Sequence, residues 1–101
     1  MTGRARLQFT NAARSDLIHL RRYSLQQFGK QAADRYVNHI ESVFRLLEKM
    51  PLAGQAQPEV GSAVRCYVKK RHRVFYELEG DIVLILRVLH HAQDVSQALT
   101  P

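Results

Sequence analysis

The pattern of apolar and polar positions opens with a short alternating segment. Leu7 and Phe9 alternate with polar neighbours, which predicts a strand over residues 4–10. After this segment, apolar residues recur at spacings of three and four, which is the period of an amphipathic helix. The stripe predicts a helix over residues 12–28. Its members are Ala13, Leu17, Leu20, Ser24 and Phe28, and Ile18 and Leu25 widen it.

A second apolar stripe predicts a longer helix over residues 30–50. Its members are Ala33, Tyr36, Val37, Ile40, Val43, Phe44 and Leu47. Gly29 ends the first helix and Pro51 ends the second, because glycine favours helix C-termini and proline cannot continue a helix. Thr10 or Asn11 supplies the side-chain oxygen that caps the first helix. With Gly29 as the break, the two helices form a hairpin.

The rest of the chain predicts a loop followed by strands. Residues 51–62 contain prolines and glycines, which is typical of a loop. Three strands are expected after it, over residues 63–68, 72–79 and 81–90, with a tight turn at Gly80 between the last two. The last segment is apolar on both faces, which predicts a strand in the interior of the sheet.

Together these elements predict an α+β domain over residues 1–101 in the order β-α-α-β-β-β. At this length, an antiparallel sheet with the helical hairpin packed on one face is a stable two-layer arrangement. The predicted elements leave the other face of the sheet without a cover. We therefore expect that face to be open and to bind a partner.

Positive charge is concentrated in one stretch, VRCYVKKRHRVFYEL, which starts at Val64. The chain has a formal net charge of +6, which favours an anionic partner. The cations of the stretch are Arg65, Lys69, Lys70, Arg71 and Arg73, and no acid lies between residues 60 and 76. Residues 69–73 are expected to form the tip of a β-hairpin. Turns usually contain Gly, Asn or Asp, so a tip of mutually repelling cations predicts contact with an anionic partner.

Several classes of site are not predicted. The single cysteine, Cys66, excludes an internal disulfide and a multi-cysteine zinc site, and it fits a reducing cytoplasm. The five histidines lack the spacing of metal ligands, and His90 and His91 point to opposite faces of a strand. Neither a signal peptide nor a membrane-spanning segment is indicated. We expect no metal, no cofactor and no membrane partner.

Three long segments carry a family resemblance. They are SDLIHLRRYSLQQFG, QAADRYVNHIESVFRLLEKMPLAG and VRCYVKKRHRVFYELEGDIVLILRVLHHAQDV. The positions that match are Asp16, Leu17, Leu20, Tyr23, Ala33, Tyr36, Ile40, Pro51, Gly54, Arg65, Tyr67, His72, Val74, Tyr76, Asp81, Val83, Ile85, Arg87, His90 and Asp94. In this order, they resemble the ParE branch of the RelE/ParE superfamily, the toxins of bacterial toxin–antitoxin modules.

The resemblance implies the same fold, a cytoplasmic bacterial protein linked to plasmid stabilisation, and a hetero-oligomer with a tightly bound cognate antitoxin. ParE toxins poison DNA gyrase by stabilising its cleaved-DNA complex, so a gyrase inhibitor is expected rather than an enzyme. The residues expected to contact the target or the acidic C-terminal segment of the antitoxin are Arg65, Lys69, Lys70, Arg71, Arg73, Arg87 and His90. Residues 94–101 are expected to help engage the target.

The alternative function is that of the RelE branch, which cleaves mRNA in the ribosomal A site. This chemistry needs groups that transfer protons and cations that stabilise the phosphate, without a metal. Arg65 and Arg87 could clamp the phosphate, and His90 or His91 could move the protons.

Structural roles compete with these catalytic roles. Tyr67 or Tyr76 could stack on a base, but Tyr76 shares a strand face with apolar residues and is expected in the core. Arg87 is expected to anchor a carboxylate such as Asp94, and Cys66 is expected to be a small core residue. The second helix alternates its cations with acids, unlike the RNA-facing helix of RelE enzymes. A third alternative is a family member that has lost its activity and still binds an antitoxin.

Overall fold

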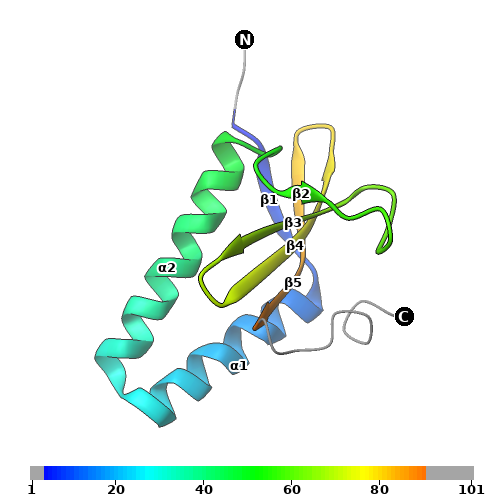
Figure 1. Ribbon diagram of the computed structural model, residues 1–101. Helices are drawn as coiled ribbons and strands as arrows, with labels where there is room; N and C mark the ends of the chain where they lie inside the picture. Colours follow the sequence, from blue (N-terminus) through cyan, green and yellow to red (C-terminus); the bar gives the residue numbers. More distant parts are fainter. Residues whose placement is uncertain (1–3, 91–101) are drawn as a thin grey trace.

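The computed structural model describes residues 4–90, which form two helices and a five-stranded sheet. In chain order the elements are β1 (Arg6–Phe9), α1 (Asn11–Phe28), α2 (Lys30–Lys49), β2 (Gln55–Ala56), β3 (Val64–Lys69), β4 (His72–Glu79) and β5 (Ile82–His90) (Figure 1). The predicted α+β class and element order are confirmed. The short strand β2 is an addition, within the stretch predicted to be a loop.

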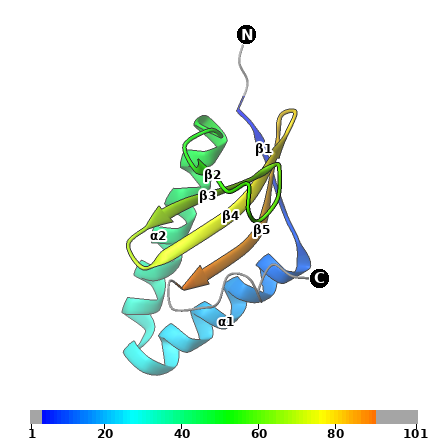
Figure 2. The ribbon, with the colours of Figure 1, turned by 45° about the vertical axis from the view of Figure 1, so that its right-hand side comes forward.

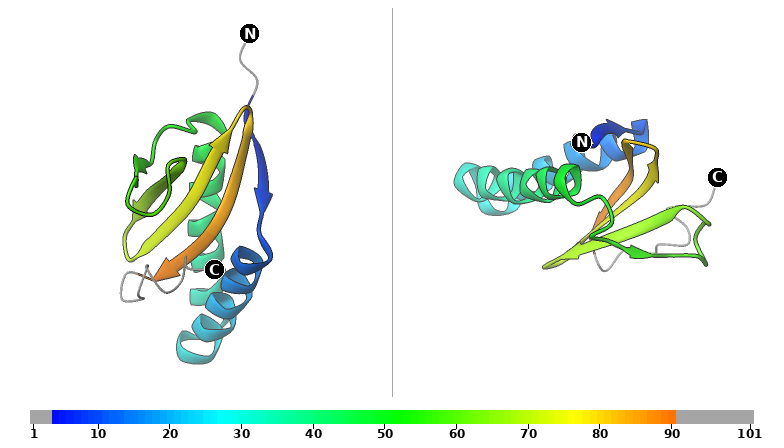
Figure 3. Two further views of the ribbon diagram at one scale, coloured as in Figure 1. Left: turned by 90° about the vertical axis from the view of Figure 1, so that its right-hand side faces the viewer. Right: turned by 90° about the horizontal axis from the view of Figure 1, so that it is seen from above.

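The strands lie in the order β1-β5-β4-β3-β2 (Figure 3, left). Strand β1 runs parallel to β5, from Arg6 opposite Ile82 to Phe9 opposite Ile85, whereas the other neighbouring pairs are antiparallel. The sheet is therefore mixed, and the prediction of a wholly antiparallel sheet is wrong for β1. Parallel neighbours need a long crossover connection, and the helical hairpin follows β1 on the way to β5. The predicted interior position of β5 is confirmed.

The residues that begin and end elements act as the sequence predicts. Thr10 caps α1, because its Oγ1 accepts a hydrogen bond from the Ala13 amide at 3.0 Å. The same hydroxyl donates to the Leu86 carbonyl at 2.8 Å, which fixes the start of α1 to β5. Gly29, with φ of 88°, ends α1, and Gly80, with φ of 61°, forms the turn between β4 and β5.

The main core lies between α2 and one face of the sheet (Figure 2). Its buried members include Ile40, Val43, Phe44 and Leu47 on α2 and Val74, Tyr76, Val83, Ile85 and Val88 on β4 and β5. Each of these large apolar side chains contributes about 2 kcal/mol when it is removed from water. The apolar stripe of α2 is therefore buried against the sheet, as the sequence predicts.

The opposite face of the sheet carries a second, smaller core. Val64 and Cys66 of β3 pack there with Phe75 and Leu89, which are 2% and 0% exposed, and Val60 packs against them from the loop that precedes β3. The prediction that this face is an open apolar surface is therefore wrong. Sequence periodicity identifies which residues share a face, but it does not reveal that a loop returns over that face.

The tip of the helical hairpin lies away from the sheet (Figures 1 and 2). Phe28 is 69% exposed and Tyr23 is 59% exposed, and Ile18 and Leu25 of α1 are also exposed. The prediction that Phe28 belongs to a buried stripe is wrong, because α1 extends past the residues that could cover its last turn. Within residues 4–90, most of the exposed large apolar side chains therefore lie on α1 or just after α2, and Val68 of β3 is exposed on the sheet.

Candidate functional site

Arg87, a candidate for phosphate binding, forms an ion pair with Asp16 of α1. Its Nε and Nη2 lie 2.8 and 2.7 Å from the two carboxylate oxygens, and the backbone amide of Val88 donates to the same carboxylate at 2.9 Å. The pKa of Arg87 is raised, first by the hydrogen bond to Asp16 and also by the charge of that carboxylate, against the opposing effect of burial. The carboxylate named in the sequence prediction, Asp94, lies outside the described residues.

Pattern analysis did not assign this role to Asp16, although the sequence carries a signal for it. Asp16 is three positions after Ala13 and one before Leu17, so it lies within the buried stripe of α1, and it is only 8% exposed. A buried acid on an apolar stripe requires a cation or several hydrogen-bond donors. The partner itself depends on the tertiary fold and on a register shift between β4 and β5 at Phe75 and Tyr76.

Tyr76 is a core residue, as the sequence predicts, and it cannot stack on a base because it is 0% exposed. Its hydroxyl donates to the Pro51 carbonyl at 2.6 Å and accepts from the Gly54 amide at 2.9 Å. A Cβ atom at Gly54 would lie 2.8 Å from Tyr76 side-chain atoms, so only glycine fits there without movement. This contact explains the glycine of the P-x-x-G sequence in the loop after α2.

Arg65 and Arg87 do not converge on one point. The Arg65 Nη2 donates to the Leu52 carbonyl at 3.1 Å, in the loop after α2, whereas the guanidinium of Arg87 binds α1. Arg65 lies opposite Tyr76 in the sheet and Arg87 lies opposite Phe75. The two guanidinium groups are therefore held by different elements, and the predicted phosphate clamp is not assembled in this structure.

His90 lies at the end of the sheet that carries the β3–β4 turn. It pairs with His72, and the two imidazole centroids are 5.6 Å apart in an edge-to-face arrangement. The Arg73 Nη2 lies 3.5 Å from the His90 carbonyl. His90 thus joins the cationic stretch, whereas His91 lies outside the described residues.

The cationic stretch is divided by the structure into anchored and free side chains. Lys69 ends β3 and its Nζ lies 3.3 Å from the Ser42 Oγ of α2, so Lys69 fastens the hairpin to the helix. Strand β4 begins at His72, so the tip consists of Lys70 and Arg71 alone rather than of residues 69–73. Within residues 4–90, these two exposed cations form no ion pair or hydrogen bond.

A hollow of about 900 Å³ lies between α2 and this turn, and we call it the basic cleft. Its lining residues are Ala32, Arg35, Tyr36, Asn38, His39, Lys70, Arg71 and His72. The pKa of His39 is lowered, first by burial and then by the charges of Lys69 and Lys70. Sequence reasoning missed the contribution of α2, because Arg35 was weighed with the other cations of that helix against its acids, and not together with the turn that lines the same cleft.

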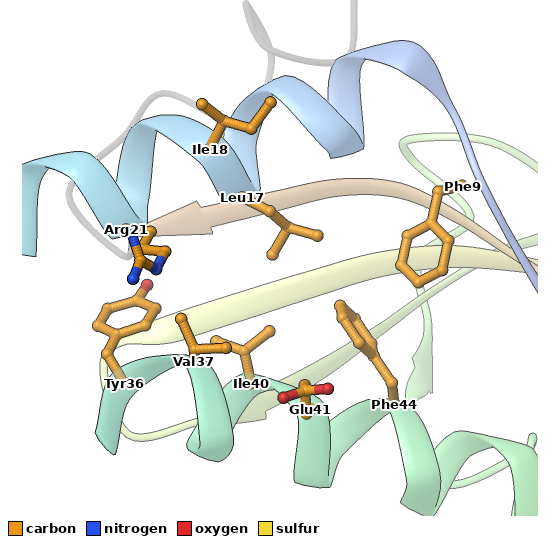
Figure 4. A pocket seen from close by; sticks show the side chains of 9 residues that line it. All are labelled: Phe9, Leu17, Ile18, Arg21, Tyr36, Val37, Ile40, Glu41 and Phe44. Carbon is orange, nitrogen blue, oxygen red and sulfur yellow. The ribbon is translucent and has the colours of Figure 1, made fainter. Parts of the chain in front are cut away.

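A second hollow, of about 400 Å³, lies between α1 and α2, and we call it the helical groove. Figure 4 shows Leu17, Val37 and Ile40 facing the space between the helices, with Phe9 and Phe44 at one end. The remaining lining residues are Ile18, Arg21, Tyr36 and Glu41. An apolar groove beside exposed apolar residues is suited to receive an amphipathic helix of another protein.

Residues 4–90 also bear on a metal site, a membrane-spanning helix and a nucleophilic cysteine. No set of three His, Cys, Asp or Glu side chains in that range is placed to hold a metal ion. Neither described helix combines the length and apolar character needed to cross a bilayer. Cys66 is buried, and burial raises the pKa of its thiol to about 11, which opposes the thiolate form that a nucleophile requires. The predicted core role of Cys66 is confirmed.

The chain is similar in sequence to known proteins. Residues 7–95 match the family described as the ParE toxin of the type II toxin–antitoxin system, parDE. Toxin ParE3 of Caulobacter vibrioides is 30% identical over 90 residues, which cover 89% of this chain and 90% of that protein. Toxin ParE1 of the same organism is 28% identical over 87 residues, which cover 86% of this chain and 90% of that protein.

Solved structures share the fold. A chain of the chromosomal ParDE system from P. aeruginosa superposes with a TM-score of 0.72 at 20% identity, covering 88% of this chain and 98% of that one. A chain of the RelBE2 toxin–antitoxin complex from Mycobacterium tuberculosis superposes with a TM-score of 0.67 at 23% identity, covering 86% of this chain and 98% of that one. At these identities, the superpositions establish the architecture alone, and the activity has to be argued from the residues of the site.

Proposed function

The chain belongs to the ParE family of type II toxin–antitoxin toxins, and from this premise we propose that it acts in the bacterial cytoplasm by binding and inhibiting DNA gyrase. In this proposal the protein is a non-enzymatic poison that stabilises the cleaved-DNA complex of gyrase. The ParE names of both Caulobacter relatives favour this function over mRNA cleavage.

The observation that carries the proposal is the ion pair between Arg87 and Asp16. RNA cleavage on this sheet would need Arg87 to stabilise the phosphate as it gains charge. Its guanidinium is instead committed to a carboxylate that is mostly buried, and breaking such a pair leaves an uncompensated charge. Tyr76 is likewise committed, through its hydroxyl, to the loop after α2. The contacts of Arg87 and Tyr76 therefore favour structural roles over RNA cleavage for these two residues.

We further propose a cognate antitoxin that neutralises the protein in a hetero-oligomer. The two structural relatives come from a ParDE system and a RelBE2 complex. An amphipathic helix of the antitoxin would occupy the helical groove, and its acidic C-terminal segment would approach the cationic end of the sheet. Of the predicted contact residues, Lys70 and Arg71 are the most available, whereas Arg65, Lys69, Arg73 and Arg87 each make a contact within the chain.

Induction of the toxin in bacteria that carry a reporter plasmid tests this function. We expect the plasmid to lose negative supercoils and the DNA-damage response to rise, with both effects reversed by the antitoxin. Primer extension on translated mRNA should show no codon-phased cuts. Codon-phased cuts that disappear when His90 and His91 are both replaced by Ala, with plasmid topology unchanged, would instead identify an mRNA interferase. Normal growth with tight antitoxin binding would identify an inactive family member.

A further inference from the structure

We propose that the basic cleft binds the phosphodiester backbone of nucleic acid, so that the toxin holds the DNA of the gyrase complex directly. This inference rests on the proposed function, and it adds a specific surface and ligand chemistry to it. The surface is formed by α2 on one side and by the β3–β4 turn on the other (Figure 2).

The cleft is lined by cations from both of its elements. Arg35 comes from α2, Lys70 and Arg71 come from the turn, and no acid is among the lining residues within the described range 4–90. The nearest acid in sequence, Asp34, is engaged elsewhere, at 3.0 Å from Lys30 and 3.9 Å from Arg21. Cations gathered without a counter-charge repel one another, and a bound anion offsets that repulsion.

Contacts between α2 and the β3–β4 hairpin hold the cleft in shape. The Lys69 Nζ reaches the Ser42 Oγ at 3.3 Å, which ties the end of β3 to α2. The rings of Tyr36 and His72 pack edge to face with centroids 4.6 Å apart, which ties the start of β4 to the same helix. Preformed sites lose less entropy when a ligand binds.

The two hairpin turns of the sheet differ in the residue that adopts a positive φ. Gly80, in the β4–β5 turn, has φ of 61°, and Lys70, in the β3–β4 turn, has φ of 56°. Glycine adopts this conformation without strain, whereas a residue with a Cβ is strained by about 1 kcal/mol. The chain therefore places glycine in one turn and accepts strain in the other, where the side chain is a cation at the mouth of the cleft. Strained backbone of this kind is concentrated at functional sites.

The shape of a phosphate group suits the donors that line the cleft. A tetrahedral phosphate accepts hydrogen bonds from several directions, and donors reach the cleft from two elements. The guanidinium groups of Arg35 and Arg71 suit bidentate contacts with phosphate oxygens. A hollow of about 900 Å³ also has room for a sugar–phosphate unit.

The test is fluorescence anisotropy of a labelled short DNA duplex with the purified full-length toxin, without gyrase. The variants are Lys70→Gly, Arg35→Gln and the control Arg45→Gln, which removes an exposed cation of α2 outside the cleft. Each cleft variant should weaken DNA binding about threefold to tenfold and lower the salt dependence by about one phosphate contact, whereas the control should change it less than twofold. Lys70→Gly should also raise the unfolding temperature, because glycine relieves the strain at that φ.

Equal losses in all three variants would overturn the inference, because they would indicate unspecific attraction. Absence of DNA binding at low salt would overturn it too. Stronger competition by polyglutamate than by polyphosphate would assign the cleft to an acidic protein instead. A gyrase assay distinguishes this inference from the proposed function. If Lys70→Gly inhibits gyrase normally and its DNA binding is unaltered, the DNA-binding role of the cleft is rejected and the proposed function stands. Cleft-dependent DNA binding without any gyrase inhibition would support the cleft and reject the proposed function.

Discussion

Asp16 and Arg87 are 71 residues apart in the sequence and meet in a bidentate ion pair that joins α1 to β5. The same carboxylate accepts the amide of Val88, and the Thr10 amide and hydroxyl bind the carbonyls of Ile85 and Leu86. After β1 ends, the first part of helix α1 therefore lies along the edge of β5 and binds its backbone. The Asp16 carboxylate and the Thr10 hydroxyl thus bind backbone groups at the edge of β5 beyond the end of β1.

Replacement of Asp16 by Asn should lower the free energy of unfolding by about 3 kcal/mol, because it leaves the Arg87 guanidinium largely buried without a counter-charge. Urea denaturation measures this change. Asp81→Asn is the matched control, because the Arg6–Asp81 pair is 3.5 Å long and both of its side chains are about two-thirds exposed. The control should cost less than about 1 kcal/mol. Equal losses in the two variants would contradict the structural role of Asp16.

Replacement of Tyr76 by Phe should lower the free energy of unfolding by about 1–3 kcal/mol, because the Gly54 amide and the Pro51 carbonyl lose their partner in a buried place. Thermal and urea denaturation measure the loss. Tyr23→Phe removes a hydroxyl from a side chain that is 59% exposed and should leave stability unchanged. A neutral Tyr76→Phe variant would mean that water replaces the hydroxyl, and it would remove this explanation of the loop sequence.

Replacement of Ile18 by Asp should weaken antitoxin binding at least about tenfold, because it replaces an apolar lining residue of the helical groove with a charge that a bound apolar helix face would remove from water. Ile18 is 56% exposed, so the fold itself should tolerate the change. Met50→Asp is the control, since Met50 is 57% exposed and lies outside the groove. Calorimetric titration with the antitoxin measures both. A normal affinity for Ile18→Asp would place the antitoxin helix on another surface.

His39 should titrate below its usual pKa of 6.5 in an NMR titration, because it is partly buried and close to Lys69 and Lys70. Arg35, Arg71 and His72, which also line the cleft, act in the same direction when charged. A folded-state pKa below the unfolded value means that His39 favours folding above about pH 6.5 and that this contribution is lost as the pH falls. Lys70→Gly should raise the pKa of His39, and Arg45→Gln should not. An unchanged pKa in Lys70→Gly would place the tip away from His39.

The features that the sequence predicted correctly depend on interactions between residues that are close together in the chain. The ends of α1, the apolar face of α2 and the turn at Gly80 depend on neighbours in the sequence, and all three were predicted. The burial of Tyr76 also followed from its strand parity. Such features need only local geometry and a hydrophobic pattern.

What the sequence could not supply is the result of long-range pairing. The parallel register of β1, the loop that brings Val60 onto the second sheet face, and the pairing of Asp16 with Arg87 all join distant segments. For the same reason, the sequence identified the cationic stretch but not which of its side chains make contacts within the chain. Only the fold shows that Lys69 is anchored to α2 and that Lys70 lines the same cleft as Arg35.

The most direct test of the central claim is a cleavage assay with purified gyrase, ATP and supercoiled plasmid. After denaturation of the enzyme, we expect linear DNA to accumulate in proportion to the added toxin, and we expect equimolar antitoxin to abolish it. A toxin that leaves cleavage and supercoiling unchanged at micromolar concentration, while it still binds its antitoxin, would contradict the account.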